Sequence, residues 1–402
     1  MNVWAPTDRL DEPYPVMVWL HGGIFTHGTG NEMVFNGDIL AKSEKVVVVI
    51  VTHRLGLTGF LDLRALEAGG VAGSANAGML DIVEALRWVR DNIASFGGDP
   101  DRVTIFGQSG GSAKVSTLSA MPAARGLFHR AIMQSGPLRR LATPDLAARV
   151  RDLTLRALGT RDLDELRSIP LEDLMTAQRR VMDEVSPIVG GSVESLPGFG
   201  PALDDVDIPE HPFDEAPSSV FDDIPLMIGW TAHEAAFMMA EFPRFTASMT
   251  DEQAVGELEA LAPGEGSARF AAAAAAAPAD PPHLVLARVV EEMTGFRGGS
   301  VRIADMVAGR GPGVWAYQFE QTTDVLGGLL GACHSLDLAY VFGTVERIPL
   351  TGSDPRRMDV SRQMMHAWAS FARDGVPAVP GRWAPWTTDS RTPHVFSGSP
   401  AV

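Results

Sequence analysis

The chain has 402 residues, which exceeds a minimal domain and suits one large α/β unit with insertions, or two domains. Its composition, 45% hydrophobic and 21% charged, is typical of a globular protein that folds in water. The formal net charge of −17 argues against nucleic acid or an anionic membrane surface as a partner, because either would require a basic stripe.

Neither a membrane span nor a leader is expected. The longest aliphatic run, at 46–51, has the length of a strand, far below the roughly 20 apolar residues of a spanning helix. Residues 1–6 have no basic or apolar leader pattern, and Cys333, the single cysteine, cannot form an intrachain disulfide. These features favour a cytoplasmic protein; a secreted protein whose leader has been removed is the alternative.

The first 140 residues alternate between strand and helix patterns. The runs at 16–20 and 46–51 are rich in β-branched residues and lack polar alternation, as strands covered on both faces do. Between 79 and 96, apolar residues recur at three- and four-residue steps, which predicts a helix that ends at the stop signal 97–100. Such alternation is typical of a doubly wound, mostly parallel α/β sheet. Further strands are expected at 103–106 and 131–135, with a helix at 112–121 between them.

Helical patterns then interrupt the sheet pattern. We interpret 141–221 and 240–310 as helical insertions that cover a site, within a single domain over 1–402. The first insertion is expected to contain helices at 145–158 and 162–182 and a Pro/Gly/Asp-rich loop at 190–219. Strands are expected again at 225–229 and 314–319, and a helix at 362–373 precedes a Pro/Trp-rich tail.

The segment 107–111, Gly-Gln-Ser-Gly-Gly, fits the pattern Gly-x-Ser-x-Gly. A serine on a tight turn between a strand and a helix projects its Oγ above the sheet, and the flanking glycines permit the strained backbone. The five-residue pattern alone is weak, but the predicted strand 103–106 precedes it and a helix follows. Ser109 is therefore a candidate nucleophile; the alternative is a glycine-rich turn with an incidental serine.

A second glycine-rich segment, His-Gly-Gly-Ile-Phe at 21–25, directly follows the predicted strand 16–20. A loop in this position can turn backbone N–H groups toward a nucleophile and form an oxyanion hole. The residue after the serine, Gly110, would supply another N–H. Each such donor lowers the barrier by roughly 3 kcal/mol. The two segments together favour a serine hydrolase.

Longer motifs point to one family. They are Asn-Val-Trp-Ala-Pro at 2–6, the loop at 19–25, His-Arg-Leu-Gly at 53–56, the near-continuous stretch 76–111 and the segment 128–136. The chain resembles the type-B carboxylesterases, the cholinesterase-like branch of the α/β-hydrolases. The resemblance implies an α/β-hydrolase fold with helical cap insertions and hydrolysis of carboxylic esters. No His/Cys/carboxylate cluster stands at metal spacing, so neither metal nor cofactor is expected.

The resemblance also implies a triad in the order Ser, acid, His. The segment 229–234 is similar to the strand end that presents the acid, which implies Glu234. Without the family, Glu234 ranks no higher than Asp222 or Asp223, and a carboxylate at a helix N-terminus is the simpler interpretation. The segment 331–337 is similar to the loop of the catalytic histidine, which implies that His334 is the base.

The remaining site residues follow from the same resemblance. The N–H groups of Gly23, Ile24 and Gly110 are implied to bind the oxyanion. Ser135 matches a position whose hydroxyl lies near the acid and the base, and Gln108 precedes the nucleophile. An apolar substrate pocket is expected, and the alternative for its members is ordinary core packing; the candidates are Phe25, Trp230, Phe237 and Met238.

The chain departs from the family pattern in the site and at its entrance. Gln108 replaces a common glutamate, Gly110 replaces a common alanine, and Ile24 replaces a glycine or alanine and is expected to crowd the acyl side. The chain also begins at the family's first strand. A naturally compact esterase or a truncated chain would account for this, and either would have a more open gorge.

Two other functions remain open at this stage. An amidase or carbamate hydrolase could use the same triad, because triad geometry alone does not select the leaving group. A non-catalytic binding protein of the same fold is the second alternative, although such proteins usually lack the nucleophile. The expected partner is a small-molecule ester, and nothing in the sequence indicates an oligomeric state.

Overall fold

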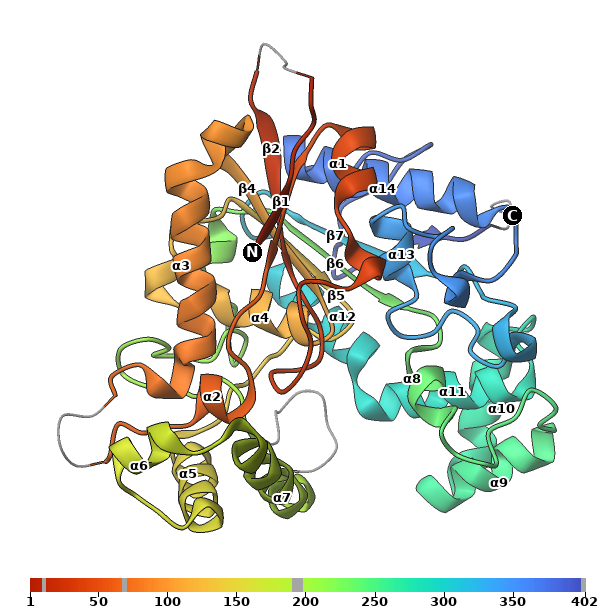
Figure 1. Ribbon diagram of the computed structural model, residues 1–402. Helices are drawn as coiled ribbons and strands as arrows, with labels where there is room; N and C mark the ends of the chain where they lie inside the picture. The colour runs from red at the N-terminus through yellow and green to blue at the C-terminus, as the bar shows by residue number, and fades with distance from the viewer. Residues whose placement is uncertain (9–11, 67–70, 190–197, 399–402) are drawn as a thin grey trace.

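The computed structural model describes residues 1–8, 12–66, 71–189 and 198–398. Within these ranges the strands form one sheet in the order β1-β3-β2-β4-β5-β6-β7-β8 (Figure 1). All neighbouring strands are parallel except the edge pair β1 and β3. The strands are β1 (Asn2–Trp4), β2 (Tyr14–Leu20), β3 (Val47–Val51), β4 (Gly98–Gln108), β5 (Arg130–Gln134), β6 (Leu226–Thr231), β7 (Val314–Phe319) and β8 (His394–Phe396).

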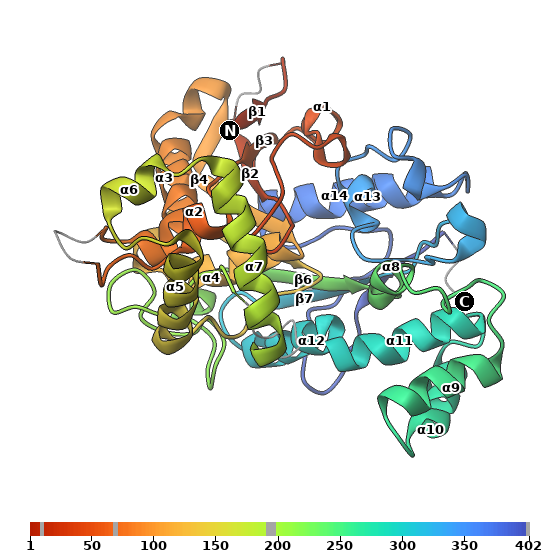
Figure 2. The same ribbon diagram turned by 60° about the horizontal axis from the view of Figure 1, so that its bottom comes forward.

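Helices cover both faces of this sheet (Figures 1 and 2). The prediction of a mostly parallel, doubly wound α/β sheet is confirmed. The α-helices are α1 (Asp38–Glu44), α2 (Gly56–Phe60), α3 (Ala77–Asn92), α4 (Gly110–Ser119), α5 (Pro144–Leu158), α6 (Leu163–Ser168), α7 (Leu171–Val189), α8 (Glu234–Met239), α9 (Asp251–Leu261), α10 (Gly266–Ala276), α11 (Pro282–Thr294), α12 (Phe296–Val307), α13 (Asp337–Val341) and α14 (Arg357–Asp374).

The two faces of β2 show why the central strands are apolar throughout. Every residue of β2 is buried. Val16 and Val18 point into a cluster shared with α3 and α4, whereas Met17 and Trp19 point into a cluster shared with α1 and α14. Successive side chains alternate between the faces of a strand, so a strand covered on both sides has no polar position.

Two groups of helices follow strands at the centre of the sheet. The helices α5–α7 follow β5, and α8–α11 follow β6. Figures 1 and 2 show the groups on opposite sides of the molecule. In the first group, Pro170 separates α6 from α7, because a proline cannot continue a helix that precedes it. The predicted helix over 162–182 is therefore two helices.

Two further differences concern strands. The segment 98–100, interpreted as a helix stop, is also the start of β4, which is much longer than predicted. The Pro/Trp-rich tail adds the edge strand β8, paired with β7. Of the predicted loop 190–219, residues 190–197 lie outside the described residues, and 198–218 contain no helix or strand.

No helix in the described ranges combines the length and the apolar character that crossing a bilayer requires.

Candidate active site

Ser109 occupies a sharp turn between β4 and α4. Its backbone has φ 56° and ψ −123°, which is strained for any residue other than glycine. A Cβ added at Gly107 would clash with the backbone of Gly111, and one added at Gly111 would clash with the carbonyl oxygen of Leu20. The glycines of the motif are thus required by the close packing of the turn against the end of β2.

The loop after β2 lies directly against this turn. Gly23 and Ile24 both have positive φ, 85° and 55°. A Cβ added at Gly110 would clash with the backbone of Ile24, so the loop and the turn touch main chain to main chain. The N–H groups of Gly23 and Ile24 make no hydrogen bond to the described part of the protein, and Gly110 begins α4, where an N–H lacks an intrahelical acceptor. Unpaired N–H donors therefore gather beside Ser109.

Lys114, which the sequence analysis did not single out, binds the backbone of this loop. Its side chain is fully buried on α4, and Nζ donates to the carbonyl oxygens of His21 and Ile24, both at 2.8 Å. Nζ also lies 5.1 Å from the centre of the Phe25 ring. Burial lowers the pKa of Lys114 to about 7. A lysine inside a helix of otherwise small or apolar residues, in a chain with three lysines, is the signal that could have revealed it.

The pKa of Lys114 predicts a pH dependence of stability. Between pH 7 and the ordinary value near 10.5, the unfolded chain binds more protons at this residue than the folded chain does. The Lys114 contribution to stability therefore rises with pH across that window, by at most about 1.4 kcal/mol per pH unit. We expect Lys114→Met to remove this part of the dependence. Urea unfolding of both proteins at pH 7 and pH 9 measures the difference, and identical pH dependences would contradict the prediction.

Glu234 and His334 are in direct contact. Glu234 is fully buried at the first residue of α8, where Oε1 accepts a hydrogen bond of 2.7 Å from the N–H of Thr231. Its Oε2 lies 2.6 Å from Nδ1 of His334. When Nδ1–H donates to this carboxylate, Nε2 carries the lone pair. The side-chain nitrogen of Gln108 is 3.1 Å from that Nε2.

Gln108 directly precedes Ser109 in the chain. Its contact with His334 therefore places the turn of Ser109 near the Nε2 edge of the His334 ring.

Phe296, at the start of α12, also belongs to the site, although the sequence did not indicate it. Its ring centre is 4.8 Å from that of His334. A Cβ added at Gly136 would lie 3.2 Å from the Phe296 ring and 3.5 Å from Cα of Ser109. Phe296 thus packs against His334 and lies near the turn of Ser109.

Two further buried carboxyls surround Glu234. Burial, and then the charge of Glu234, raises the pKa of Asp337 to about 6, while hydrogen bonds from Gln134 and Tyr317 oppose the rise. Burial also raises the pKa of Glu291 to about 7. Both groups hold a proton more readily than an exposed acid does, which limits the negative charge that gathers around Glu234.

The other histidines near the loop are less suited to act as a base. His21 and His53 stack with ring centres 4.9 Å apart. Burial, followed by the charge of Lys114, lowers the pKa of His21 to about 4 and that of His53 to about 3. Each directs Nδ1 to a backbone carbonyl, of Gly22 and Arg54 respectively. A base with so low a pKa binds the proton of a serine hydroxyl weakly.

Ser135 lies at the end of β5, next to β6. Its N–H donates to the carbonyl oxygen of Gly229 at 2.8 Å, and its backbone φ is 49°. The side chain is fully buried, and Oγ has no hydrogen-bond partner in the described part of the chain. Such strain together with an unpaired buried hydroxyl is common at functional sites.

The four apolar candidates divide into two pairs. Phe25 and Trp230 are buried in the hydrophobic core, which matches the core alternative for these residues. Phe237 and Met238 lie on α8, three and four residues after Glu234, with 50% and 40% of their surface exposed. The second pair is therefore accessible to a ligand, and the first pair is not.

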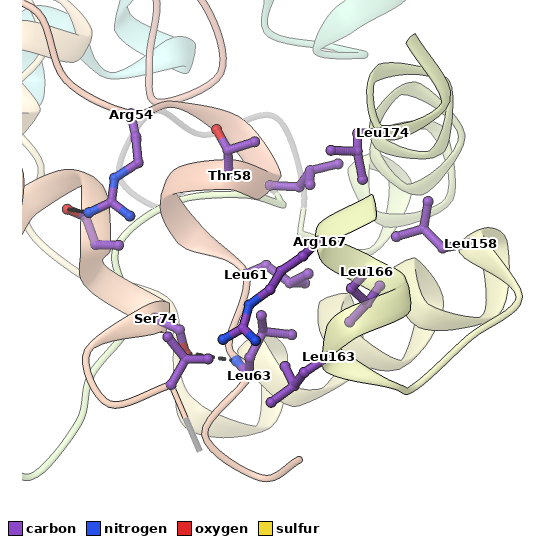
Figure 3. Close-up of a pocket in the computed structure, with 13 residues that line it drawn as sticks. Arg54, Thr58, Leu61, Leu63, Ser74, Leu158, Leu163, Leu166, Arg167 and Leu174 are labelled. Carbon is purple, nitrogen blue, oxygen red and sulfur yellow. Dashed lines mark hydrogen bonds between the residues drawn. The ribbon is translucent and has the colours of Figure 1, made fainter. Parts of the chain in front are cut away.

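A cavity of about 250 Å³ lies elsewhere, between α2 and the helices α5–α7 (Figure 3). Its walls are mostly leucines, among them Leu61, Leu158 and Leu174. Neither Ser109 nor His334 lines it, so it is separate from the site described above. For a metal, the described residues offer no group of three or more His, Cys, Asp or Glu side chains that could hold one.

A serine on a strained turn, free N–H donors and a histidine paired with a buried carboxylate define a serine hydrolase on an α/β sheet. A sequence profile described as "Carboxylesterase family" matches residues 1–397. The chain belongs to this family and is a carboxylic-ester hydrolase.

Individual relatives agree. The chain is 36% identical to the phenmedipham hydrolase of Pseudarthrobacter oxydans over 385 residues, which are 94% of this chain and 73% of that protein. It is 34% identical to the para-nitrobenzyl esterase of Bacillus subtilis over 399 residues, 97% of this chain and 77% of that one. Among solved structures, the Geobacillus stearothermophilus carboxylesterase superposes with a TM-score of 0.78 at 32% identity, covering 98% of this chain and 81% of the other.

Proposed function

We propose that the chain hydrolyses carboxylic esters of small to medium apolar substrates through the triad Ser109, His334 and Glu234. The contact of 2.6 Å between His334 Nδ1 and the buried Glu234 carboxylate carries the proposal. It fixes the tautomer in which Nε2 can accept a proton, on the side of the ring where Gln108 and the turn of Ser109 lie. The loops that hold these three residues follow different strands, so their meeting is a property of the fold.

The chemistry follows from these positions. His334 Nε2 takes the proton from Ser109 as Oγ attacks the ester carbonyl, and Glu234 stabilises the resulting imidazolium. The N–H groups of Gly23, Ile24 and Gly110 bind the oxyanion, with Gly110 at the positive end of α4. The proton then passes to the leaving alcohol. Water, activated by His334, releases the acid and regenerates the serine.

The neighbouring side chains favour apolar substrates. Phe237 and Met238 are exposed on α8, next to the acid, and we assign them to the wall that meets the substrate. Ile24, which is 39% exposed beside the oxyanion donors, narrows the acyl side. We further propose that 141–221 and 240–310 are insertions that flank the entrance within a single domain.

A matched set of leaving groups tests this function. We expect p-nitrophenyl butyrate to be hydrolysed fastest. Its p-nitroanilide should react much more slowly because an anilide nitrogen is a poorer leaving group than a phenolate oxygen. A p-nitrophenyl carbamate should also react more slowly because its nitrogen lone pair makes the carbonyl carbon less electrophilic. The names of the relatives add a p-nitrobenzyl ester and phenmedipham as probes. Release of p-nitrophenol or p-nitroaniline is followed by absorbance. Faster turnover of the anilide or the carbamate than of the ester would contradict the proposal.

The choice of acid has its own test. Glu234→Gln keeps the size of the side chain but removes the charge that holds Nδ1–H of His334. We expect kcat to fall by a factor on the order of 10⁴, because the imidazole loses its tautomer and its counter-charge. Asp222→Asn is the control, since Asp222 pairs with Arg310 at the surface. If both variants kept wild-type kcat, Glu234 would not be the acid.

A further inference from the structure

His233, the residue before Glu234, connects the acid to the loop of the base. It lies at the N-terminal end of α8 and is 1% exposed. Its backbone N–H donates to the carbonyl oxygen of Ala332 at 3.0 Å. Its Nδ1 accepts a hydrogen bond of 2.9 Å from the N–H of the same residue. The backbone N–H and the ring of His233 thus bind both the C=O and the N–H of Ala332. Ala332 lies two residues before His334, in the loop that carries the candidate base.

The Nε2 edge of the His233 ring also has a partner. Nε2 lies 2.9 Å from Oδ2 of Asp280, and Asp280 in turn pairs with Arg288 on α11. A backbone N–H can only donate, so Nδ1 carries a lone pair and the hydrogen is on Nε2, facing the carboxylate. His233 is therefore an uncharged imidazole in one tautomer. Burial lowers its pKa, which agrees with this state.

The close packing of Gly331 against the His233 ring is a second, independent contact between this ring and the base loop. Gly331 precedes Ala332 with φ 56°, and a Cβ at this position would lie 2.6 Å from Nδ1 of His233. Any side chain at 331 would therefore displace the ring. The loop is built closely onto His233 from two successive residues, both just before the base.

We propose that His233 is a positioning residue that sets the distance between Glu234 and His334 by clamping Ala332. The proposal rests on the proposed triad. It assigns His233 no contact with substrate. The clamp joins the turn after β6 to the loop after β7, whose only covalent connection runs through the whole α8–α12 region. Loss of the clamp is expected to misplace the base and slow the chemical step, with little effect on substrate binding.

Two near-isosteric variants separate the ring's two contacts. In His233→Asn, the amide oxygen can take the place of Nδ1 and still accept from Ala332. In His233→Gln, the amide can reach Asp280 but offers no acceptor at the Nδ1 position. We expect His233→Gln to lower kcat for p-nitrophenyl butyrate on the order of 10- to 100-fold at an almost unchanged KM, because small displacements of catalytic groups have effects of this size. His233→Asn should stay within about threefold of wild type, since it retains the acceptor.

Asp280 supplies a second pair in case His233→Gln does not fold, as judged by circular dichroism. Asp280→Asn keeps an oxygen that accepts from Nε2–H, whereas Asp280→Ala frees the tautomer, so only the alanine variant should lose kcat. Wild-type kcat in His233→Gln, or equal losses in His233→Gln and His233→Asn, would overturn the clamp; for the second pair, equal kcat in both Asp280 variants would do so. Ser109→Ala in the same assay keeps the two proposals apart: if it retains turnover the triad fails, and if it is inactive only the clamp is at stake.

Discussion

Replacement of Ser109 by alanine is expected to lower kcat for p-nitrophenyl butyrate by a factor on the order of 10⁶, as removal of the nucleophile does in serine proteases. The substitution deletes one oxygen atom from the strained turn between β4 and α4. The N–H groups of the oxyanion loop remain, so a small residual acceleration over the reaction in water should persist. Initial rates at saturating substrate measure the wild type, and long incubations at high enzyme concentration, corrected for spontaneous hydrolysis of the ester, measure the variant.

The control is Ser112→Ala, which deletes the same atom one helical turn further along α4 from a fully buried side chain. It should keep kcat close to that of the wild type. Both variants should show the far-ultraviolet circular dichroism of the wild type. A folded Ser109→Ala protein with wild-type turnover would show that another group performs the attack.

The second large effect is expected for His334→Ala, which should lower kcat by a factor on the order of 10⁵ to 10⁶. Without the imidazole, no group takes the proton from Ser109, and the buried Glu234 loses the ring that it orients at 2.6 Å. Loss of the base and loss of the nucleophile are expected to be similar, because the two residues act as a unit. The double variant should therefore be hardly slower than either single variant.

His366 is a suitable control because it forms the same kind of pair elsewhere. Its Nδ1 lies 3.1 Å from a carboxylate oxygen of Glu44, but the side chain is half-exposed on α14. His366→Ala should leave kcat unchanged. If the fold losses in kcat of the two single variants multiplied in the Ser109/His334 double variant, the two residues would not act in one step.

The sheet was largely predictable because its strands are buried on both faces and read as continuous apolar runs. The run at 46–51 and the strand β3 differ by one residue. The edge strand β8 was missed because it has only three residues, of which one is buried, and therefore shows no continuous apolar run. At the start of β4, Gly98 pairs with Tyr14 of β2, and the register then shifts so that Val16 pairs with Val103. The glycine and proline at 98–100 therefore gave no strand pattern, and the regular pairing begins at the predicted segment 103–106.

For the site, the local motif pointed to Ser109 as a candidate nucleophile but not to its partners. From the residues alone, Glu234 could not be distinguished from Asp222; their difference is burial and contact, since one faces His334 inside the protein and the other pairs with Arg310 outside. The resemblance to a family supplied that choice. Lys114 and Phe296 escaped notice because each acts through contacts with chain segments distant in sequence.

The most direct test of the triad is to label the nucleophile itself. A fluorophosphonate reacts with a serine whose oxygen is activated by a histidine, and peptide mass spectrometry locates the adduct. The protein should carry one adduct, on Ser109, and labelling should be abolished in Ser109→Ala and greatly slowed in His334→Ala. A stable adduct on another residue, or none on a protein that hydrolyses p-nitrophenyl butyrate, would contradict the assignment of Ser109 as the nucleophile.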